Sequence, residues 1–317
     1  MLPEVVIDLR QSPEKRWVLS SDQAEQAREL LRSYTTDLGL SSGMANLVFD
    51  AAEAVVRPDY WAEMQSLAQH VGVPVRDVVV SNLYYDALKV ALGCTAFAVN
   101  HEGAVLHARN LDWWTENGAL SRTTTVCKFI GAPAGDFVTI GWPGFAGLFS
   151  GVAPGRFAIS LNAVLSLEPA QLATPVVFLL RSVLEEAQNF DQAADMLATT
   201  PIPCDCLLLL SGIRSREMIV LERTPSRHAI RKPDAGFIAV TNDYRSLQAG
   251  GGEGNELLRT SCGRFQRITS LLEARDPQSP NECFTYLSDP EVAMRITVQQ
   301  MVFRAANGEY QVRVPTR

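Results

Sequence analysis

A short hairpin signal constrains the fold of this chain more than any other feature. Two β-prone runs, residues 95–99 and 104–108, are separated by four residues that end in glycine. Such a pair of runs predicts an antiparallel β-hairpin. If its loop has two to four residues, strand pairing brings Cys94, just before the first run, opposite the segment from Arg109 to Asp112. The sequence therefore predicts that a guanidinium and a carboxylate flank a thiol.

The residues before this thiol are predicted to be mostly helical after a short initial strand. Ser20 and Gln23 have the spacing of a capping box and precede an apolar stripe at helical spacing. The stripe consists of Ala24, Ala27, Leu30, Leu31, Tyr34 and Leu38. A second helix is expected over residues 58–71. Residues 1–93 are therefore expected to form a helical segment.

Strands are predicted to dominate after Cys94. One helix is expected over about residues 174–197 and another over about residues 257–274. The glycine-rich stretch 250–254 is expected to be a loop. It does not indicate a nucleotide-binding motif, because no strand-to-helix phosphate signature accompanies it. Helices before and between runs of strands indicate the α+β class.

The residues around Cys94 suit a nucleophile that uses its own amine. Arg109 favours a thiolate and can lower the pKa of the thiol, and Asp112 can hold an ammonium or orient an amine. An α-amino group has a pKa of roughly 7.7 to 8.0, so it can accept a proton near neutral pH without a histidine. Cutting the bond between Gly93 and Cys94 would create that amine. The pattern therefore indicates an N-terminal cysteine nucleophile.

Longer stretches of the sequence resemble a known family. The segments Gly93-Cys94-Thr95-Ala96-Phe97 and Arg109-Asn110-Leu111-Asp112 are similar to the N-terminal-nucleophile (Ntn) amidases. That family includes acid ceramidase, N-acylethanolamine acid amidase, choloylglycine hydrolase and isopenicillin N acyltransferase. Six further segments extend the likeness, residues 6–9, 13–17 and 80–86 before the nucleophile and residues 143–147, 155–162 and 240–244 after it.

The resemblance implies a fold and a processing event. The fold would be the four-layer αββα sandwich of the Ntn hydrolases, with a mostly helical N-terminal segment. Self-cleavage before Cys94 would leave a helical chain, residues 1–93, associated with a catalytic chain, residues 94–317. The catalytic chain would hydrolyse the amide bond of an N-acyl amide through an acyl-thioester, and no cofactor is implied.

The resemblance also implies roles for distant residues. Asn242, in the Thr-Asn motif, would donate to an oxyanion, and Asn162 would belong to the same site. Arg264 matches the second active-site arginine, with Arg259 as an alternative. Each residue alone has an ordinary explanation, because asparagines often end strands, a lone cysteine such as Cys94 is usually core, and an exposed ion pair contributes little. Their combination in the family's order favours catalysis.

Two departures leave the substrate open. Ala163 stands where the acid ceramidase branch has a glutamate, and Asp112 follows Cys94 by 18 residues, a spacing closer to isopenicillin N acyltransferase than to the lysosomal members. We expect N-acylethanolamine-like or ceramide-like lipids as substrates. The alternatives are an acyltransferase, a bile-salt or penicillin amidase, and an uncleaved ligand-binding homologue. Residues that could line an acyl pocket, or equally form plain core, are Trp113, Trp114, Phe145, Leu148 and Phe149.

Composition argues against several other classes. A net charge of −7 in 317 residues gives no nucleic-acid footprint, and no apolar run is long enough to span a bilayer. The N-terminal residues lack signal-peptide character and no Asn-X-Ser/Thr acceptor occurs, so a cytoplasmic location is expected.

The remaining cysteine and histidine groupings carry no strong signal. Cys204 and Cys206, with His228 as the nearest histidine, lack a second ligand pair, and no metal site is expected. His107 shares a strand face with Arg109 and is expected to be a packed strand histidine, although a substrate contact stays open. Association of the two cleaved chains is expected, and a homo-oligomer is possible.

Overall fold

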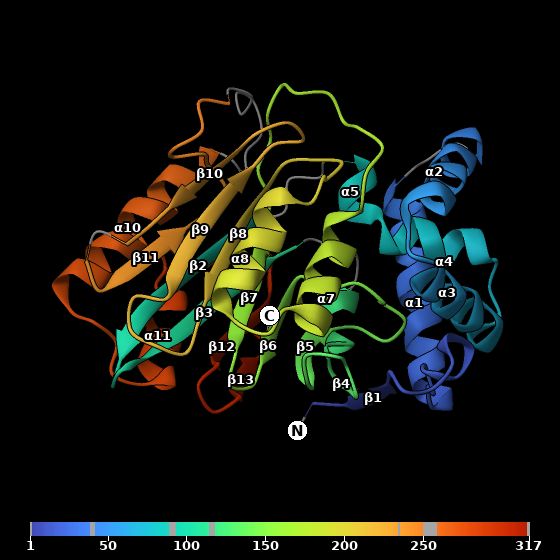
Figure 1. Ribbon diagram of the computed structural model, residues 1–317, viewed down its shortest axis with the longest axis horizontal. Coiled ribbons are helices and arrows are strands. Elements are labelled where there is room, and N and C mark those ends of the chain that lie inside the picture. Colours follow the sequence, from blue (N-terminus) through green and yellow to red (C-terminus); the bar gives the residue numbers. More distant parts are fainter. Residues whose placement is uncertain are drawn as a thin grey trace.

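The computed structural model describes residues 2–38, 42–88, 93–113, 118–233, 235–249 and 259–315. Two β-sheets pack face to face, helices cover the outer face of each sheet, and a further group of helices packs against one end of this sandwich (Figure 1). The predicted α+β class and αββα layering are confirmed.

The larger sheet has eight strands in the order β1-β4-β5-β6-β7-β8-β9-β10. Neighbouring strands are antiparallel except for β1, which pairs with β4 in parallel. This pairing ties the start of the chain to the sandwich. The strands are β1 (Glu4–Asp8), β4 (Thr125–Ile130), β5 (Phe137–Gly141), β6 (Ser150–Ala153), β7 (Phe157–Asn162), β8 (Cys206–Ser211), β9 (Met218–Arg223) and β10 (His228–Arg231).

The smaller sheet has five antiparallel strands in the order β11-β2-β3-β12-β13. They are β2 (Gly93–His101), β3 (Ala104–Asp112), β11 (Phe237–Val240), β12 (Thr297–Arg304) and β13 (Glu309–Arg313). The predicted hairpin is β2 and β3. Its turn is Glu102-Gly103, and both residues have positive φ, 48° and 79°, which is the backbone that a two-residue hairpin turn requires.

Helices close both outer faces of the sandwich. The larger sheet is covered by α7 (Val176–Glu186) and α8 (Phe190–Thr199), and the smaller sheet by α10 (Ser261–Ala274) and α11 (Pro280–Leu287). The prediction of one helix over residues 174–197 is wrong, because Ala187 is extended and Asn189 starts a second helix. The Asn189 side chain accepts from the Gln192 N–H at 2.9 Å, as a good N-cap residue does. The predicted loop 250–254 lies outside the described residues.

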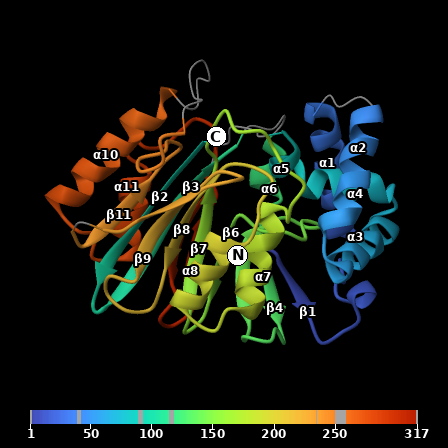
Figure 2. The same ribbon diagram turned by 45° about the horizontal axis from the view of Figure 1, so that its top comes forward.

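The N-terminal segment is mostly helical, as predicted. Its elements after β1 are η1 (Pro13–Lys15), α1 (Ser21–Leu38), α2 (Ser42–Val55), α3 (Pro58–Val71), α4 (Val75–Asn82) and α5 (Tyr84–Leu88), and the short α6 (Ala119–Arg122) lies against α1. Figure 2 shows this group beside the sandwich rather than on either sheet face. The Ser20 and Gln23 capping box is formed in both directions, at 2.9 and 3.2 Å. Within the described ranges, no helix is both long and apolar enough to cross a membrane.

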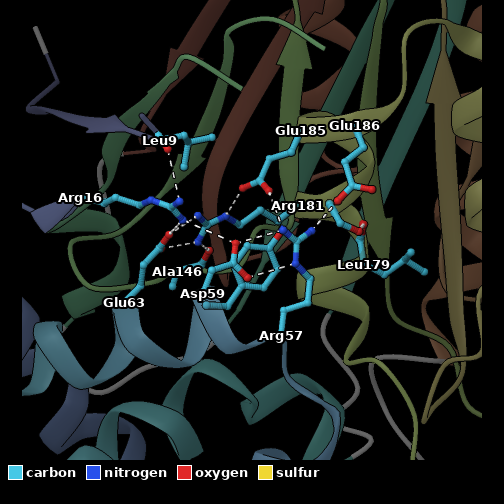
Figure 3. Close-up of polar contacts among 12 residues, drawn as sticks. Leu9, Arg16, Arg57, Asp59, Glu63, Ala146, Leu179, Arg181, Glu185 and Glu186 are labelled. Carbon is cyan, nitrogen blue, oxygen red and sulfur yellow. Dashed lines mark hydrogen bonds and ion pairs between the residues drawn. The ribbon is translucent and has the colours of Figure 1, made fainter. Parts of the chain in front are cut away.

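A buried ion-pair cluster joins the N-terminal helices to the sandwich (Figure 3). Glu63 on α3 accepts two hydrogen bonds from Arg181 on α7, at 2.6 and 2.7 Å, and both side chains are fully buried. Glu63 also accepts from Arg16 and from the indole of Trp17, each at 2.7 Å. Arg181 reaches Glu185 one turn along its own helix, at 2.8 Å. The cluster therefore contains charged groups from both sides of Cys94.

Candidate active site

Side-chain direction along the hairpin decides what each residue of the site can reach. Phe97 packs against α10 and α11, whereas Ala96 packs against the larger sheet, so even-numbered residues of β2 face the space between the sheets. Cys94 is even-numbered, and Ala96 pairs with Arg109 across the hairpin. Directly paired residues share a face. Cys94 and Arg109 therefore both point between the sheets.

Cys94 is the second residue of β2, and its side chain is fully buried. Arg109 Nη2 donates to Cys94 Sγ at 3.3 Å, and the carbonyl oxygen of Leu161 lies 3.9 Å from the same sulfur. Arg109 is fixed by the carbonyl oxygen of Phe149 at 2.8 Å and by short hydrogen bonds to Ser150 Oγ and Leu161 O. These acceptors are neutral, and no carboxylate of the described residues forms an ion pair with Arg109. Its charge is thus available to a thiolate.

The backbone of Cys94 is held separately from its thiol. The Cys94 N–H donates to Asn242 Oδ1 at 3.0 Å, and Arg264 Nη1 donates to the Cys94 carbonyl oxygen at 2.6 Å. Arg264 also donates to Asn242 Oδ1 and to Thr95 Oγ1, at 2.8 and 2.9 Å. Burial lowers the pKa of Arg264, while Asp112 opposes that shift. Arg259 is exposed, so the structure places Arg264, not its alternative, at the site.

The side-chain amide of Asn242 is oriented by its neighbours. Its oxygen accepts from Cys94 and Arg264, and its Nδ2 donates to the carbonyl oxygen of Ala163 at 2.7 Å. Asn162 Nδ2 donates to the carbonyl oxygens of Val240 and Thr241, at 3.3 and 2.9 Å, and so holds the strand end that carries Asn242. In the uncut chain Asn242 therefore presents an acceptor to Cys94. The oxyanion-donor role implied for its Nδ2 group stays a prediction.

Asp112 faces the opposite side of the hairpin from the thiol. It pairs with Gly93, and its Oδ1 accepts from Thr297 Oγ1 at 2.5 Å. Its Oδ2 is buried and has no hydrogen-bond partner among the described residues. Burial raises the pKa of Asp112, against the opposing effects of Arg264, Thr297 and Arg109. The prediction that both charges flank the thiol thus needs correction, since Arg109 contacts the sulfur and Asp112 lies beside the backbone of Gly93.

Aromatic side chains form a wall next to this site. Trp113 lies 5.6 Å from Phe149 and 5.8 Å from Trp142, between ring centroids, and Phe145 stacks on Phe149 at 5.1 Å. Leu148 is buried beside them, whereas Trp114 lies outside the described residues. A cavity of about 20 Å³ separates Trp142 and Phe145 from α1 and α4. This wall is packed core with little free volume.

The N-terminal segment holds the loop that carries part of this wall. Asn82 on α4 accepts from the Ala146 N–H at 2.7 Å and donates to the carbonyl oxygen of Gly144 at 3.2 Å. The carbonyl oxygen of Ala146 in turn accepts a hydrogen bond from Arg181 at 3.0 Å. Asn82 belongs to a segment whose resemblance to the acid ceramidase branch was noted in the sequence. Its structural task is to fix the loop that precedes Phe149.

Other candidate residues have structural roles. His107 lies between Ser160 Oγ and Ser211 Oγ, at 2.8 and 2.9 Å, and burial together with Arg109 lowers its pKa to about 3. It is therefore a neutral, packed strand histidine, as expected. Cys204 and Cys206 are buried thiols, and the described residues contain no group of three or more His, Cys, Asp or Glu side chains suited to a metal ion.

One residue of the site has no local signal in the sequence. Thr297 starts β12 and contacts Asp112 although 185 positions separate them in the chain. Threonine is an ordinary strand residue, so only the pairing of β3 with β12 shows that Thr297 lies beside Asp112. Its contact with Asp112 makes it a site residue.

Comparison with known proteins identifies the family. The family model described as "Acyl-coenzyme A:6-aminopenicillanic acid acyl-transferase" matches residues 99–300, more than half of the chain. Acid ceramidase from Mus musculus is 26% identical over 253 residues, which cover 70% of this chain and 64% of the relative. N-acylethanolamine-hydrolyzing acid amidase from Caenorhabditis elegans is 26% identical over 238 residues, which cover 68% and 66%. The chain thus spans slightly less than two thirds of the length of these relatives.

A solved structure shares the fold. The Caenorhabditis elegans N-acylethanolamine-hydrolyzing acid amidase ortholog superimposes with a TM-score of 0.54 and 21% identity, covering 66% of this chain and 92% of that one. The αββα layers of the fold, the sequence matches and the resemblance of the segments around Cys94 all indicate the same family. The chain belongs to the acyl-coenzyme A:6-aminopenicillanic acid acyl-transferase family of Ntn hydrolases.

Proposed function

We propose that this protein is a self-processing cysteine amidase that hydrolyses the carbon–nitrogen bond of N-acyl amides. One observation carries the proposal. Arg109 contacts the thiol of Cys94 while Asn242 and Arg264 hold the Cys94 N–H and carbonyl oxygen. The contacts thus serve separately the two groups that an N-terminal nucleophile uses, its thiol and its amine.

Self-cleavage would divide the chain into residues 1–93 and 94–317. The Cys94 sulfur attacks the carbonyl carbon of Gly93, the peptide C–N bond breaks, and the nitrogen takes a proton to become the amine of Cys94. The Gly93 acyl group is then a thioester on sulfur. Water attacks the thioester, which leaves a Gly93 carboxylate and a free thiol. The fully buried Cys94 of the uncut chain supports this order, because a substrate reaches the sulfur only after the preceding residues move.

Turnover would repeat the same chemistry on a substrate amide. The amine of Cys94 takes the thiol proton, the thiolate attacks the acyl carbon, and the amine returns the proton to the departing nitrogen. Hydrolysis of the acyl-thioester completes the cycle. Arg109 would stabilise the thiolate, and the Nδ2 group of Asn242 would donate to the oxyanion. Loss of one such donor typically lowers the rate by about 10² to 10³.

The substrates that we propose are fatty-acyl amides of the N-acylethanolamine or ceramide type. Two relatives are named acid ceramidase and N-acylethanolamine-hydrolyzing acid amidase. Trp113, Phe145 and Phe149 add an apolar wall beside the thiol. This wall would line the acyl site after the bond between Gly93 and Cys94 has been cut.

A homologous series of N-acyl amides tests the substrate. Each buried methylene contributes up to about 0.8 kcal/mol, which is roughly fourfold in kcat/KM. We expect kcat/KM to rise with acyl length until the site is full, and Cys94→Ala to be inactive on every member. A flat profile would reject lipid amides, and failure of the cut protein to hydrolyse any amide would reject the amidase.

A second candidate activity is acyl transfer. The matching family model is described as an acyl-transferase, and a transferase differs only in that an amine replaces water at the thioester. Adding a primary amine during turnover distinguishes the two. Hydrolysis predicts free fatty acid as the main product, and transfer predicts the new amide.

A further inference from the structure

We propose that Thr297 is the positioning residue for Asp112. Its hydroxyl fixes one carboxylate oxygen, so that the other faces the bond between Gly93 and Cys94 and, after cleavage, the new amine. The proposal rests on the self-cleavage argued above and adds a residue to it. Thr297 does not touch the reacting atoms and acts through Asp112.

The Thr297 hydroxyl has one proton, and its surroundings direct that proton to Asp112. The Met294 N–H donates to Thr297 Oγ1 at 3.1 Å, which uses the hydroxyl as an acceptor. Met294 O also lies within reach at 2.9 Å, but it already accepts from the Thr297 N–H at 3.0 Å. Asp112 Oδ1, at 2.5 Å, is the nearer and the charged acceptor. The hydroxyl therefore accepts from Met294 and donates to Asp112.

The second oxygen of Asp112 is left for another group. Oδ2 is fully buried, has no hydrogen-bond partner among the described residues, and lies 3.4 Å from the position that a Cβ would take on Gly93. A buried carboxylate oxygen without a partner is costly. The ammonium form of the Cys94 amine, created one residue away, has the charge and the donors to fill this position. Asp112 can thus hold the amine only if its carboxylate keeps this rotation.

Strand pairing explains why this threonine can hold the carboxylate. Thr297 pairs with Asp112 across β3 and β12, and the register shifts between Thr297 and Gln299. Paired residues of neighbouring strands share a face, and such shifts are common next to active sites. The turn at Met294 and the irregular start of β12 therefore hold Thr297 in the position from which its hydroxyl reaches Asp112.

The titration of Asp112 depends on the groups around it. The charged side chains that act on it are Arg264 from α10 and, from the opposite face of its own strand, Arg109, and the Cys94 thiol lies on the neighbouring strand. Burial raises the Asp112 pKa and the Thr297 hydrogen bond lowers it. Removing the hydroxyl leaves both arginines in place but raises that pKa further. The carboxylate form is then lost at a higher pH than in the wild type.

Thr297→Val removes the hydroxyl and keeps the shape of the side chain. A hydrogen bond to a charged group is worth enough that we expect self-cleavage to slow by about 10- to 100-fold. We also expect the acid limb of the cleavage rate against pH to move to higher pH. Thr297→Ala removes the same hydroxyl without adding a methyl group and gives the same test if valine disturbs folding. Thr297→Ser keeps the hydroxyl and should restore both the rate and the acid limb.

The measurement is the rate of chain cutting from pH 4 to pH 9 on denaturing gels, with thermal unfolding as a check on the fold. Thr285→Val, at an exposed position on α11, is the matched control and should leave both unchanged. Suppose that the wild-type chain cuts itself and that Thr297→Val and Thr297→Ala cut at the same rate with the same acid limb. This result would overturn the positioning role of Thr297 and leave the proposed function standing. Equal losses in the Thr297→Ser and Thr297→Val variants would also overturn it. A folded wild-type chain that never cuts would instead reject the proposed function.

Discussion

Replacing Glu63 by glutamine should weaken the interface between the N-terminal helices and the β-sandwich. The Glu63 carboxylate accepts four hydrogen bonds, two from Arg181 and one each from Arg16 and Trp17, all at 2.6 to 2.7 Å. In glutamine one oxygen remains and can accept two of these hydrogen bonds, whereas the NH₂ group that replaces the other oxygen faces two donors. Arg181 keeps Glu185 as its carboxylate partner.

The expected cost follows from burial. Glu63 and Arg181 side chains have no exposed area, and removing one partner of such a pair costs about 3 to 5 kcal/mol. At roughly 2 °C per kcal/mol for a chain of this size, the melting temperature should fall by about 6 to 10 °C. If the chain is cut before Cys94 as proposed, the pair joins residues 1–93 to residues 94–317. The dissociation constant of the two pieces should therefore rise by about two to four orders of magnitude.

Two assays and one control decide the outcome. Thermal unfolding of the uncut Cys94→Ala chain measures the stability effect, and gel filtration of the cut protein at decreasing concentration measures dissociation. Glu25→Gln is the control, because Glu25 forms an ion pair with Arg28 while 66% of its side chain is exposed, and such pairs contribute less than about 1 kcal/mol. If Glu63→Gln is no more damaging than Glu25→Gln, the buried cluster does not join the two pieces.

Two further predictions concern the scissile bond, and a third concerns the buried carboxyl group of Asp86 on α5. Gly93→Ala should block self-cleavage on denaturing gels, because a Cβ there would lie 2.8 Å from Met294 Sδ and 2.9 Å from Asp112 Cβ; normal cutting would refute this crowding. Asp112→Asn should slow cutting or turnover in a protein that still unfolds cooperatively, and near-normal activity would remove Asp112 from the site. Burial raises the Asp86 pKa from 3.8 to about 7, so the folded state binds the extra proton and stability should fall as pH rises from about 4 to 7. Asp86→Asn should flatten this fall in melting temperature between pH 5 and pH 8, and an unchanged slope would contradict it.

Glu63 gives a separate pH dependence of opposite sign. Burial alone would raise its pKa, but Arg181, Arg16 and Trp17 together hold it below the usual 4.5. A depressed carboxyl pKa stabilises the fold above the unfolded pKa, and that stabilisation is lost as pH falls through the folded value. The cut pieces should therefore stay associated near neutral pH and separate more readily below about pH 4. Unchanged association under strongly acid conditions would contradict this.

The local parts of the site could be predicted from the sequence. A glycine-containing loop between two β-prone runs determines the hairpin, so the neighbourhood of Cys94, Arg109 and Asp112 follows from strand pairing alone. The faces could have been assigned too, since two-residue periodicity puts Arg109 on the side of Cys94 and Asp112 on the other. Only a family motif indicates Arg264, because no local sequence pattern shows that an arginine on a helix belongs to a distant site.

Other features depend on tertiary structure. The helices α7 and α8 share one apolar pattern, and their boundary is set by the Asn189 cap, a single hydrogen bond that periodicity does not reveal. Thr297 and Glu63 contact residues more than 100 positions away. Such pairs depend on which strands and helices become neighbours, and the residue types alone do not specify that.

Intact mass measurement of the purified protein tests the central claim most directly. If Cys94 is an N-terminal nucleophile, the wild-type chain should give two masses, for residues 1–93 and for residues 94–317 with an N-terminal cysteine, whereas Cys94→Ala should give one. A wild-type protein that hydrolyses amides at full rate while every molecule remains a single intact chain would contradict the account.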